Sequence, residues 1–276
     1  MVNRFEAIMS RVEQNPDKKR CAVVCADGPT REAVREAETR GLIQAEFFSG
    51  DLAPMEAVRG VHAGQFDILL KGNIDTAVLL KEVVNKEYGL LTGRLISHVA
   101  LLDVPRYHKL LLLTDGGMVM YPDLDQLRGI LENAAGVMRR LGVELPKVAC
   151  LAAVEKVHER MPETVRAAAL KELQQTGEIR DCLVEGPISF DLAFDREAGR
   201  TKGYDSPVAG DADVFLVPDF VSGNLLAKSL VYGGGARFAG FLAGARAPVI
   251  LTSRASSAEE KLYSIACSAL VSSLSN

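Results

Sequence analysis

The residues whose types and spacing could do chemistry begin with one stretch in the second half of the chain. Ser206–Asp213 leads into an apolar run, Val214–Val217, and a Pro-Asp pair then turns the chain toward Gly223 and Asn224. This pattern predicts a strand, a turn and a helix that the Gly-Asn pair opens. The start of a helix presents unpaired backbone N–H groups that suit an anion. Because Asn224 and Lys228 lie four residues apart, we expect both on one helical face near that end.

A second candidate site follows an earlier apolar strand, at Lys71-Gly72-Asn73. Asp75 or Thr76 can cap a helix that begins directly afterwards. Glycine lets the backbone approach a ligand closely, and Lys71 places a positive charge beside the start of that helix. We therefore interpret this turn as a second place where an anionic ligand fits.

A third candidate site, Ser253-Arg254, precedes the last predicted helix, residues 256–274. The planar fork of an arginine donates two hydrogen bonds at once, which suits a phosphate group. The spacing Ser256-x-x-Glu259 fits a helix capping box, and Ser257-x-x-Glu260 fits one if the helix starts one residue later. Spacing alone leaves both registers open.

These stretches resemble the phosphate acetyl/butyryltransferase family, whose members exchange coenzyme A and inorganic phosphate on a short acyl group. The matching motifs are Lys71-Gly72-Asn73, Thr92-Gly93-Arg94, Ser97-His98, Thr114-Asp115-Gly116-Gly117-Met118, Glu185-Gly186-Pro187, the stretch Ser206–Asp219 with Ser222-Gly223-Asn224, and Leu251-Thr252-Ser253-Arg254. Because several motifs occur in order over roughly residues 65–270, the resemblance is specific.

The resemblance implies roles for individual residues. Ser253 would hydrogen-bond at the reacting centre, and Arg254 would contact phosphate or coenzyme A. The catalytic carboxylate would be Glu260 in the register of acetyl-specific members or Glu259 in that of butyryl-type members, and we favour Glu260. The residues expected to bind substrate are Lys71, Gly72, Asn73, Arg94, Ser97, Asn224 and Lys228.

The implied reaction is acyl-CoA plus phosphate giving acyl phosphate plus coenzyme A, by direct attack in a ternary complex. Ala255 stands where acetyl-specific members have glycine, and the helix after it contains Tyr263, so we favour the butyryl-type branch. A phosphate acetyltransferase of the same family is the alternative. Coenzyme A would be a substrate, and no cofactor is expected.

Two rival interpretations keep other chemistry open. The chain has Val119 where many relatives have asparagine, and its first domain is short, which would fit a non-catalytic protein that binds coenzyme A or phosphate. A metal- and nicotinamide-dependent decarboxylating dehydrogenase would need an aspartate trio. The dense acidic group that could supply one is Asp211, Asp213 and Asp219. Their placement on both sides of one predicted strand argues against shared ligation.

The elements that must position these residues alternate between short apolar strands and helices, which predicts an α/β fold with a parallel sheet covered on both faces. The predicted strands are 20–26, 45–48, 67–70, 96–102, 109–114, 148–153, 181–184, 214–217, 237–244 and 249–252. The link between 96–102 and 109–114 is too short for a crossover helix, so these two strands should pair antiparallel.

The resemblance also implies a domain organisation. It predicts two α/β domains with a central cleft, an isocitrate/isopropylmalate dehydrogenase-like architecture. The first domain would be residues 1–93 plus 253–276, and the second would be residues 94–252. A homo-oligomer built on a dimer is expected from the same resemblance.

Composition excludes several classes of protein. A net charge of −4 and a pI near 5.7 give no electrostatic case for nucleic-acid binding. No apolar run approaches the roughly 20 residues that span a bilayer, and the first residues lack the apolar core of a signal peptide, so a cytoplasmic protein without a membrane partner is expected. The five cysteines include no C-x-x-C pair, and the four histidines show no metal-ligand spacing. We expect no metal.

Overall fold

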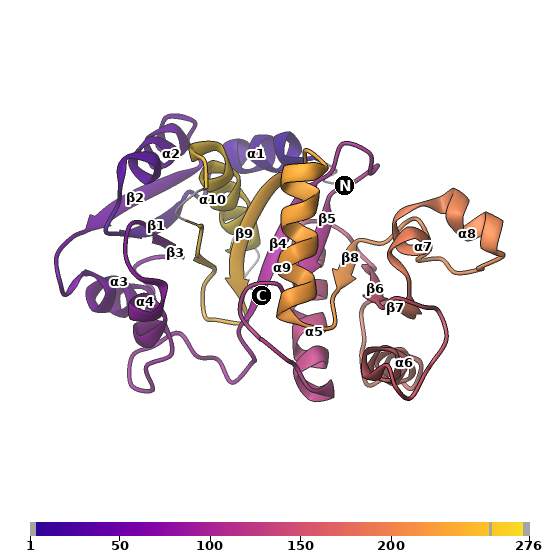
Figure 1. Ribbon diagram of the computed structural model, residues 1–276. Helices are drawn as coiled ribbons and strands as arrows, with labels where there is room; N and C mark the ends of the chain where they lie inside the picture. Colours follow the sequence, from indigo (N-terminus) through magenta and orange to yellow (C-terminus); the bar gives the residue numbers. More distant parts are fainter. Residues whose placement is uncertain (1–3, 254–255, 273–276) are drawn as a thin grey trace. The chain divides into compact units, whose positions relative to one another are not determined.

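The computed structural model describes residues 4–253 and 256–272 (Figure 1). These residues form two compact units. Residues 97–237 form the central unit, and the described residues before 97 and after 237 form the terminal unit. The sequence placed 238–252 in the second domain, whereas the structure groups these residues with the terminal unit.

The terminal unit contains a mixed sheet in the order β2-β1-β3-β10-β9. Its strands are β1 (Lys19–Val24), β2 (Ile43–Phe48), β3 (Ile68–Lys71), β9 (Arg237–Ala243) and β10 (Val249–Ile250). β1 pairs parallel with β2 and β3, β3 pairs parallel with β10, and β10 pairs antiparallel with β9. Because β10 extends the sheet from β3, the chain returns to this unit before residue 253.

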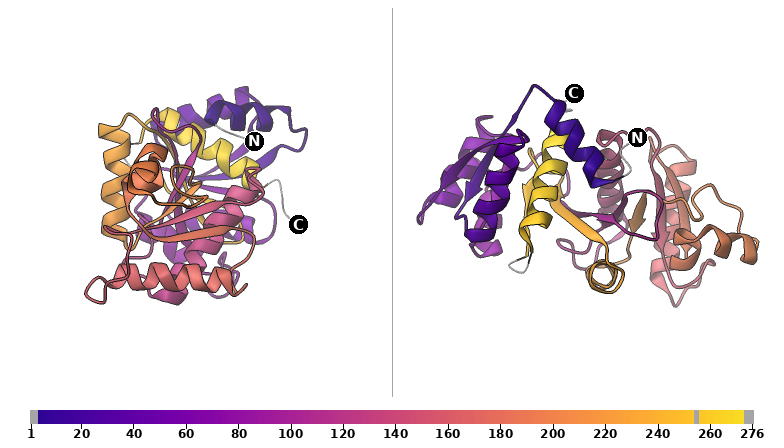
Figure 2. Two further views of the ribbon diagram at one scale, coloured as in Figure 1. Left: turned by 90° about the vertical axis from the view of Figure 1, so that its right-hand side faces the viewer. Right: turned by 90° about the horizontal axis from the view of Figure 1, so that it is seen from above.

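Helices cover the sheet of the terminal unit. They are α1 (Phe5–Gln14), α2 (Gly28–Thr39), α3 (Ala53–His62), α4 (Thr76–Val83) and α10 (Ala258–Ser272). Every residue of α10 from Lys261 to Val271 is buried, as expected for a helix packed on all sides. Figure 2 shows α10 beside α1, where the rings of Tyr263 and Phe5 stack with their centroids 4.5 Å apart.

The strands of the central unit follow one another in the order β4-β5-β8-β6-β7. Its strands are β4 (Ser97–Asp103), β5 (Leu111–Thr114), β6 (Lys147–Leu151), β7 (Leu183–Ile188) and β8 (Val214–Leu216). β4 and β5 pair antiparallel, as the short link between them predicts, and the remaining pairs are parallel. The sequence therefore predicted the α/β class and most of the strands.

The helices of the central unit follow its strands. They are α5 (Leu124–Arg140), α6 (Pro162–Gln175), α7 (Phe190–Phe194), α8 (Arg196–Lys202) and α9 (Phe220–Lys228), which continues into a π-helical turn (Ser229–Gly233). A capping box between Asp123 and Gln126 starts α5, whose buried face includes Leu127, Leu131 and Met138. This is the face that the 3-4 spacing of apolar residues predicts.

The sequence analysis predicts no helix over α1, α3 or α8 of the described residues. α3 occupies the segment after Gly50 that the sequence left without an element, and α8 ends at Gly203 in the left-handed conformation. In the described part of the chain, no helix combines the length and the apolar character that crossing a membrane requires.

Candidate active site

The terminal unit gathers two of the three candidate motifs at one edge of its sheet. β1, β3 and β10 run parallel, with Val24 opposite Lys71 and Ile250 opposite Leu70. The chain leaves these strands at Cys25–Asp27, Gly72–Asn73 and Leu251–Ser253. These loops, with the first residues of α10, form what we call the β1–β3–β10 edge. The carboxyl ends of parallel strands are where open α/β sheets bind ligands.

Gly72 joins two of these loops tightly. Its N–H donates to Val24 O over 2.8 Å, and the Asn73 N–H donates to Cys25 O over 2.7 Å. A Cβ atom on residue 72 would lie 2.3 Å from Cys25 O, so only glycine fits. The observed close approach is therefore to the neighbouring backbone, while the Asn73 side chain is exposed.

Lys71 is the last residue of β3, and its side chain is only 3% exposed. Its Nζ donates to Gly72 O over 3.2 Å. Asp75 caps α4 by accepting a hydrogen bond from Ala77 N–H, so a carboxylate of the chain already occupies the start of that helix. The cation supplied at this turn is thus the buried ammonium of Lys71.

The start of α10 resolves the two capping registers. The Glu260 N–H donates to Ser257 Oγ and the Ser257 N–H donates to Glu260 Oε2, both over 3.1 Å. This is the later register, with the capping box on Ser257 and Glu260. Arg254, the predicted phosphate-binding arginine, lies outside the described residues, and Ser253 before it is exposed.

The side chain of Glu259 has different neighbours from that of Glu260. It is exposed and lines a surface hollow with Glu32, Arg35 and other residues of α2. The Tyr263 hydroxyl donates to Glu259 Oε1 over 2.8 Å. The two glutamates that the sequence could not separate therefore have distinct surroundings: a tyrosine contact for one and a helix cap for the other.

Lys261 was missed by the sequence analysis. Its side chain is 3% exposed, and its Nζ donates to Thr252 Oγ1 over 2.8 Å. Burial lowers the pKa of Lys261, and the charges of Asp27 and Glu260 oppose that shift in part. The available signal was a lysine directly before a run of mainly apolar and small residues, Leu262–Val271. That signal indicates burial only once α10 is known to pack on every side.

Arg94 lies away from this edge. It is exposed in a loop where the Thr92 hydroxyl donates to Gly244 O over 2.7 Å. Gly244 follows β9, which pairs antiparallel with β10, so the contact lies near the amino end of β10. Lys71 ends β3 at the opposite end of the strands. The substrate-binding role of Arg94 stays a prediction.

The central unit holds Ser97 at the start of β4, beside the end of β5. The Ser97 side chain is fully buried, and Asn133 Nδ2 of α5 donates to its Oγ over 2.9 Å. The Thr114 hydroxyl donates to His98 O over 2.8 Å. Ser97 thus links the sheet to α5, and its predicted contact with substrate is untested.

Asp115 organises the loop after β5. Its buried carboxylate accepts hydrogen bonds from the N–H groups of Gly117 and Met118, each over 2.8 Å, and of Val119 over 3.3 Å. It also accepts from His98 N–H over 3.0 Å. Because the contact at residue 119 uses the backbone, valine preserves the loop despite the departure from relatives.

The helix after β8 begins earlier than the sequence indicated. α9 starts at Phe220, capped by Asp219, which accepts from Ser222 N–H over 2.8 Å. The expectation that Gly223-Asn224 opens the helix is wrong, because the Asp219 side chain captures an amide two positions before Asn224. The Asp219 carboxylate therefore caps the helix start that the sequence predicts to suit an anion.

Asn224 and Lys228 consequently lie along α9 instead of at its start. Asn224 Nδ2 donates to Gly116 O over 3.2 Å, which ties α9 to the loop after β5. A Cβ atom on Gly116 would lie 2.7 Å from the backbone of Gly223, so these two glycines permit that contact. Lys228 is the exposed last residue of α9.

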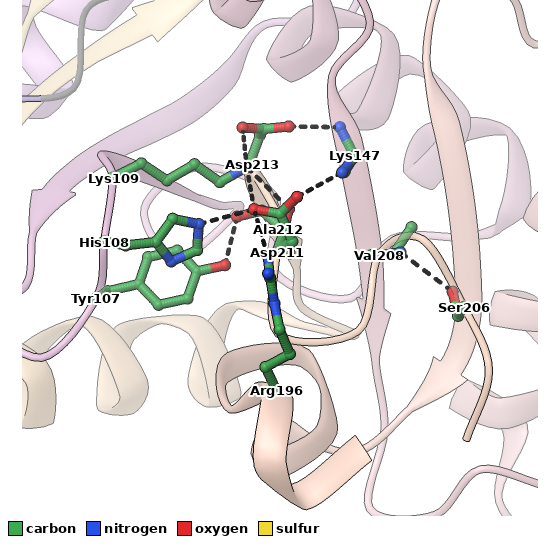
Figure 3. A network of polar contacts seen from close by, with 10 residues as sticks. All are labelled: Tyr107, His108, Lys109, Lys147, Arg196, Ser206, Val208, Asp211, Ala212 and Asp213. Atoms are coloured by element: carbon green, nitrogen blue, oxygen red, sulfur yellow. Dashed lines mark hydrogen bonds and ion pairs between the residues drawn. The ribbon is translucent and has the colours of Figure 1, made fainter. Parts of the chain in front are cut away.

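The acidic residues of the rival dehydrogenase interpretation have other partners (Figure 3). Asp211 contacts Lys147 Nζ over 2.5 Å, His108 Nε2 over 2.7 Å and Lys109 Nζ over 3.2 Å, and Asp213 contacts Lys109 Nζ over 2.6 Å. Burial acts to raise the pKa of Asp211, but these hydrogen bonds and charges outweigh it and hold the pKa well below its usual range.

This group, Asp211 and Asp213 with Lys109, Lys147 and His108, is the Asp211 cluster. It lies at the amino ends of β6 and β8, away from Asp219, which caps α9. The three aspartates therefore do not share a site. In residues 4–253 and 256–272, no group of three or more His, Cys, Asp or Glu side chains is arranged to hold a metal ion.

Known proteins are similar to this chain in both sequence and fold. The family model for phosphate acetyl/butaryl transferase matches residues 13–269. A phosphate butyryltransferase of Clostridium acetobutylicum is 38% identical, over 98% of this chain and 99% of that protein. A phosphate acetyltransferase of Thermotoga maritima is 41% identical, over 78% of this chain and 73% of that protein. A branched-chain phosphotransacylase of Enterococcus faecalis V583 superimposes with a TM-score of 0.83 at 33% identity, over 91% and 98% of the two chains.

The chain therefore belongs to the phosphate acetyl/butyryl transferase family. The predicted family is confirmed, as is the α/β class. The central cleft and the dehydrogenase-like architecture stay predictions.

Proposed function

We propose that this protein is an acyltransferase that exchanges coenzyme A and inorganic phosphate on a short-chain acyl group. Family membership supports the reaction class. The observation that carries the proposal within this chain is the β1–β3–β10 edge, where the buried ammonium groups of Lys71 and Lys261 accompany Ser253. Such a cationic edge suits an anionic substrate because charges act strongly where water is excluded.

The proposed reaction is a direct acyl transfer. A phosphate oxygen attacks the thioester carbonyl carbon, the C–S bond breaks, and the thiolate of coenzyme A leaves with the electron pair and takes up a proton. Ser253 is proposed to hydrogen-bond at the reacting carbonyl, where a donor stabilises the developing oxyanion. Arg254 is proposed to contact phosphate or coenzyme A. Coenzyme A takes part as a substrate.

Glu260 is proposed as the group that exchanges the thiol proton. A carboxylic acid can protonate the leaving thiolate, and in reverse a carboxylate can remove the proton, since the thiolate is the nucleophile. The helix cap uses Glu260 Oε2, so the exchange would fall to Oε1. Glu259 is the alternative, in the register of butyryl-type members.

We propose butyryl-CoA and its three- to five-carbon neighbours as the preferred substrates. Ala255 and Tyr263 support this choice, together with the butyryltransferase relative that matches the whole chain. Acetyl-CoA is the alternative, in line with the acetyltransferase relative. A cytoplasmic location and a homo-oligomer built on a dimer stay predictions.

The test is thiol release from acetyl-, propionyl-, butyryl- and isobutyryl-CoA with and without phosphate. We expect release that depends on phosphate, with the highest kcat/KM for the longer chains. Each methylene contributes roughly 1 kcal/mol in a fitted pocket, so the preference should be modest. An equal or higher kcat/KM with acetyl-CoA would favour the acetyltransferase alternative. Binding of coenzyme A in calorimetry without turnover of any substrate would favour the non-catalytic alternative.

A further inference from the structure

Within the described residues, no carboxylate pairs directly with the ammonium group of Lys261. Its ammonium group makes one side-chain hydrogen bond within the described residues, to the neutral hydroxyl of Thr252. No carboxylate oxygen of those residues lies within 4 Å of its Nζ. The residues outside the described part, 1–3, 254–255 and 273–276, include no Asp or Glu. The side chain is 3% exposed, so water compensates little of the charge.

The nearest acidic side chains already have structural tasks. Asp27 caps α2 by accepting from Thr30 N–H over 2.9 Å, and Glu260 caps α10 through Ser257. Both raise the pKa of Lys261 from a distance, but burial outweighs them and the pKa is lowered overall. A buried ammonium without a paired anion is costly, because removing an ion from water requires a compensating partner.

The position of Lys261 indicates what that partner is. Thr252, which Lys261 holds by its hydrogen bond, directly precedes Ser253. β10 leads to Thr252 and pairs with β3, which ends at Lys71. Lys71 and Lys261 therefore bring two buried ammonium groups to elements that meet at the β1–β3–β10 edge, which favours an added negative charge there.

We propose that Lys261 supplies the counter-charge for the phosphate group and positions Thr252 and Ser253 beside it. This inference rests on the proposed acyl transfer to phosphate. Free inorganic phosphate and the phosphoryl group of the acyl phosphate share the required chemistry, a dianion that a buried ammonium stabilises. Lys261 is therefore a positioning and anion-binding residue, while proton exchange stays with Glu260.

The kinetic test compares Lys261→Met, Lys261→Arg and Lys81→Met. Lys81 is an exposed lysine of α4 in the same unit and serves as the matched control. Because hydrogen bonds to charged groups are worth about a factor of 10 to 100, Lys261→Met should raise KM for phosphate by that amount. KM for acyl-CoA should change much less. Lys261→Arg keeps the charge and should recover part of the phosphate affinity.

A second readout does not require turnover. Saturating inorganic phosphate, compared with chloride of equal ionic strength, should raise the melting temperature of the wild type and of Lys81→Met. Lys261→Met should lose most of that rise. The inference would be overturned if Lys261→Met had the wild-type KM for phosphate and the wild-type rise in melting temperature with phosphate, even if the enzyme were active. Absence of thiol release from every acyl-CoA in the wild type would instead refute the proposed reaction, and the melting comparison would still decide the role of Lys261.

If Lys261→Met does not fold, the pH dependence of stabilisation by phosphate in the wild type tests the inference. The lowered pKa of Lys261 means that its ammonium group loses its proton below the ordinary value of 10.5. The charged groups that act on it are Asp27 and Glu260. Phosphate stabilisation should therefore decline with rising pH before pH 10.5. Stabilisation that stays constant through that range would contradict the inference.

Discussion

Lysines at two places in the molecule differ in how the fold compensates their charge. In the Asp211 cluster, Lys109 and Lys147 each contact an aspartate carboxylate at 2.5–2.6 Å. At the β1–β3–β10 edge, Lys261 is more deeply buried, yet its hydrogen-bond partner is a threonine hydroxyl. The described residues pair the first set of charges with carboxylates, but none of their carboxylates pairs directly with Lys261.

The difference separates structural charges from functional ones. A cation that the fold pairs with its own carboxylates can hold elements together, as Lys147 of β6 and Asp211 before β8 do (Figure 3). A buried cation without a carboxylate partner destabilises the folded protein. An anionic ligand that binds beside the cation offsets this cost, which is why such a cation indicates a binding site. Changes at the first site should affect stability, and changes at the second should affect substrate binding and rate.

The largest expected effect is at the β1–β3–β10 edge, for Glu260→Gln. If Glu260 exchanges the thiol proton, replacing the carboxylate should lower kcat on the order of 10²–10⁴-fold. Glutamine also serves in a capping box, so the start of α10 should persist. Steady-state thiol release measures the loss, and the melting temperature verifies that the fold is retained.

Glu259→Gln is the matched control for that variant. The Glu259 carboxylate accepts a hydrogen bond from the Tyr263 hydroxyl and lines a hollow beside α2. Replacing it with glutamine should therefore leave kcat near the wild-type value. The reverse result, an inactive Glu259→Gln with an active Glu260→Gln, would move the proton exchange to the register of butyryl-type members. Two active variants would refute the carboxylate mechanism.

The second effect is at the compensated cluster, for Asp211→Asn. Removing the Asp211 carboxylate leaves Lys147 without its carboxylate partner, whereas Lys109 keeps its contact with Asp213. Since Asp211 is 22% exposed, we expect a loss of about 2 kcal/mol in the free energy of unfolding, measured by urea denaturation. KM for phosphate should stay at the wild-type value. A changed KM without a stability loss would erase the distinction between the two sites.

The pH dependence of that variant follows from the lowered pKa of Asp211. Because the folded protein holds the carboxylate ionised, its stabilising contribution is present above the ordinary value of 3.8 and is lost as pH falls through the folded pKa. The difference in unfolding free energy between wild type and Asp211→Asn should therefore shrink below pH 3.8. A difference that is constant with pH would contradict the ion-pair explanation.

A smaller effect is expected for Arg254→Lys, which keeps a cation after Ser253 but removes the planar fork. We expect about a tenfold increase in KM for phosphate or coenzyme A, because one ammonium does not reproduce a bidentate contact. The fold should be unaffected. Unchanged KM values for both substrates would make Arg254 a surface residue and would leave Lys71 and Lys261 as the cations that matter.

Periodicity and turn chemistry predicted most of the elements because these signals are local. The apolar spacing of α5 and the short link between β4 and β5 are examples. Helix starts were less accessible, since several side chains compete for the cap. Asp219 caps α9, so that helix begins before Gly223, and the cap of α10 is Ser257 instead of Ser256.

The candidate site was only partly accessible from the sequence. Ordered motifs indicated Lys71, Ser253 and Glu260, because each follows a strand or opens a helix. Lys261 depends on tertiary packing: its burial arises only where α10 meets α1, α2 and the sheet. Pairing of β10 with β3, which brings Thr252 to the edge with Lys71, is likewise a long-range contact that no local spacing encodes.

The central claim is that no carboxylate of the described residues pairs with the buried charge of Lys261. It is tested most directly by the unfolding free energies of Lys261→Met and Lys147→Met in phosphate-free buffer. Methionine keeps much of the volume and removes the charge. We predict that Lys261→Met is as stable as the wild type or more stable, because a buried unpaired ion is removed. Lys147→Met should be less stable, because Asp211 loses a partner at 2.5 Å. A loss of stability in Lys261→Met as large as that in Lys147→Met would contradict the account.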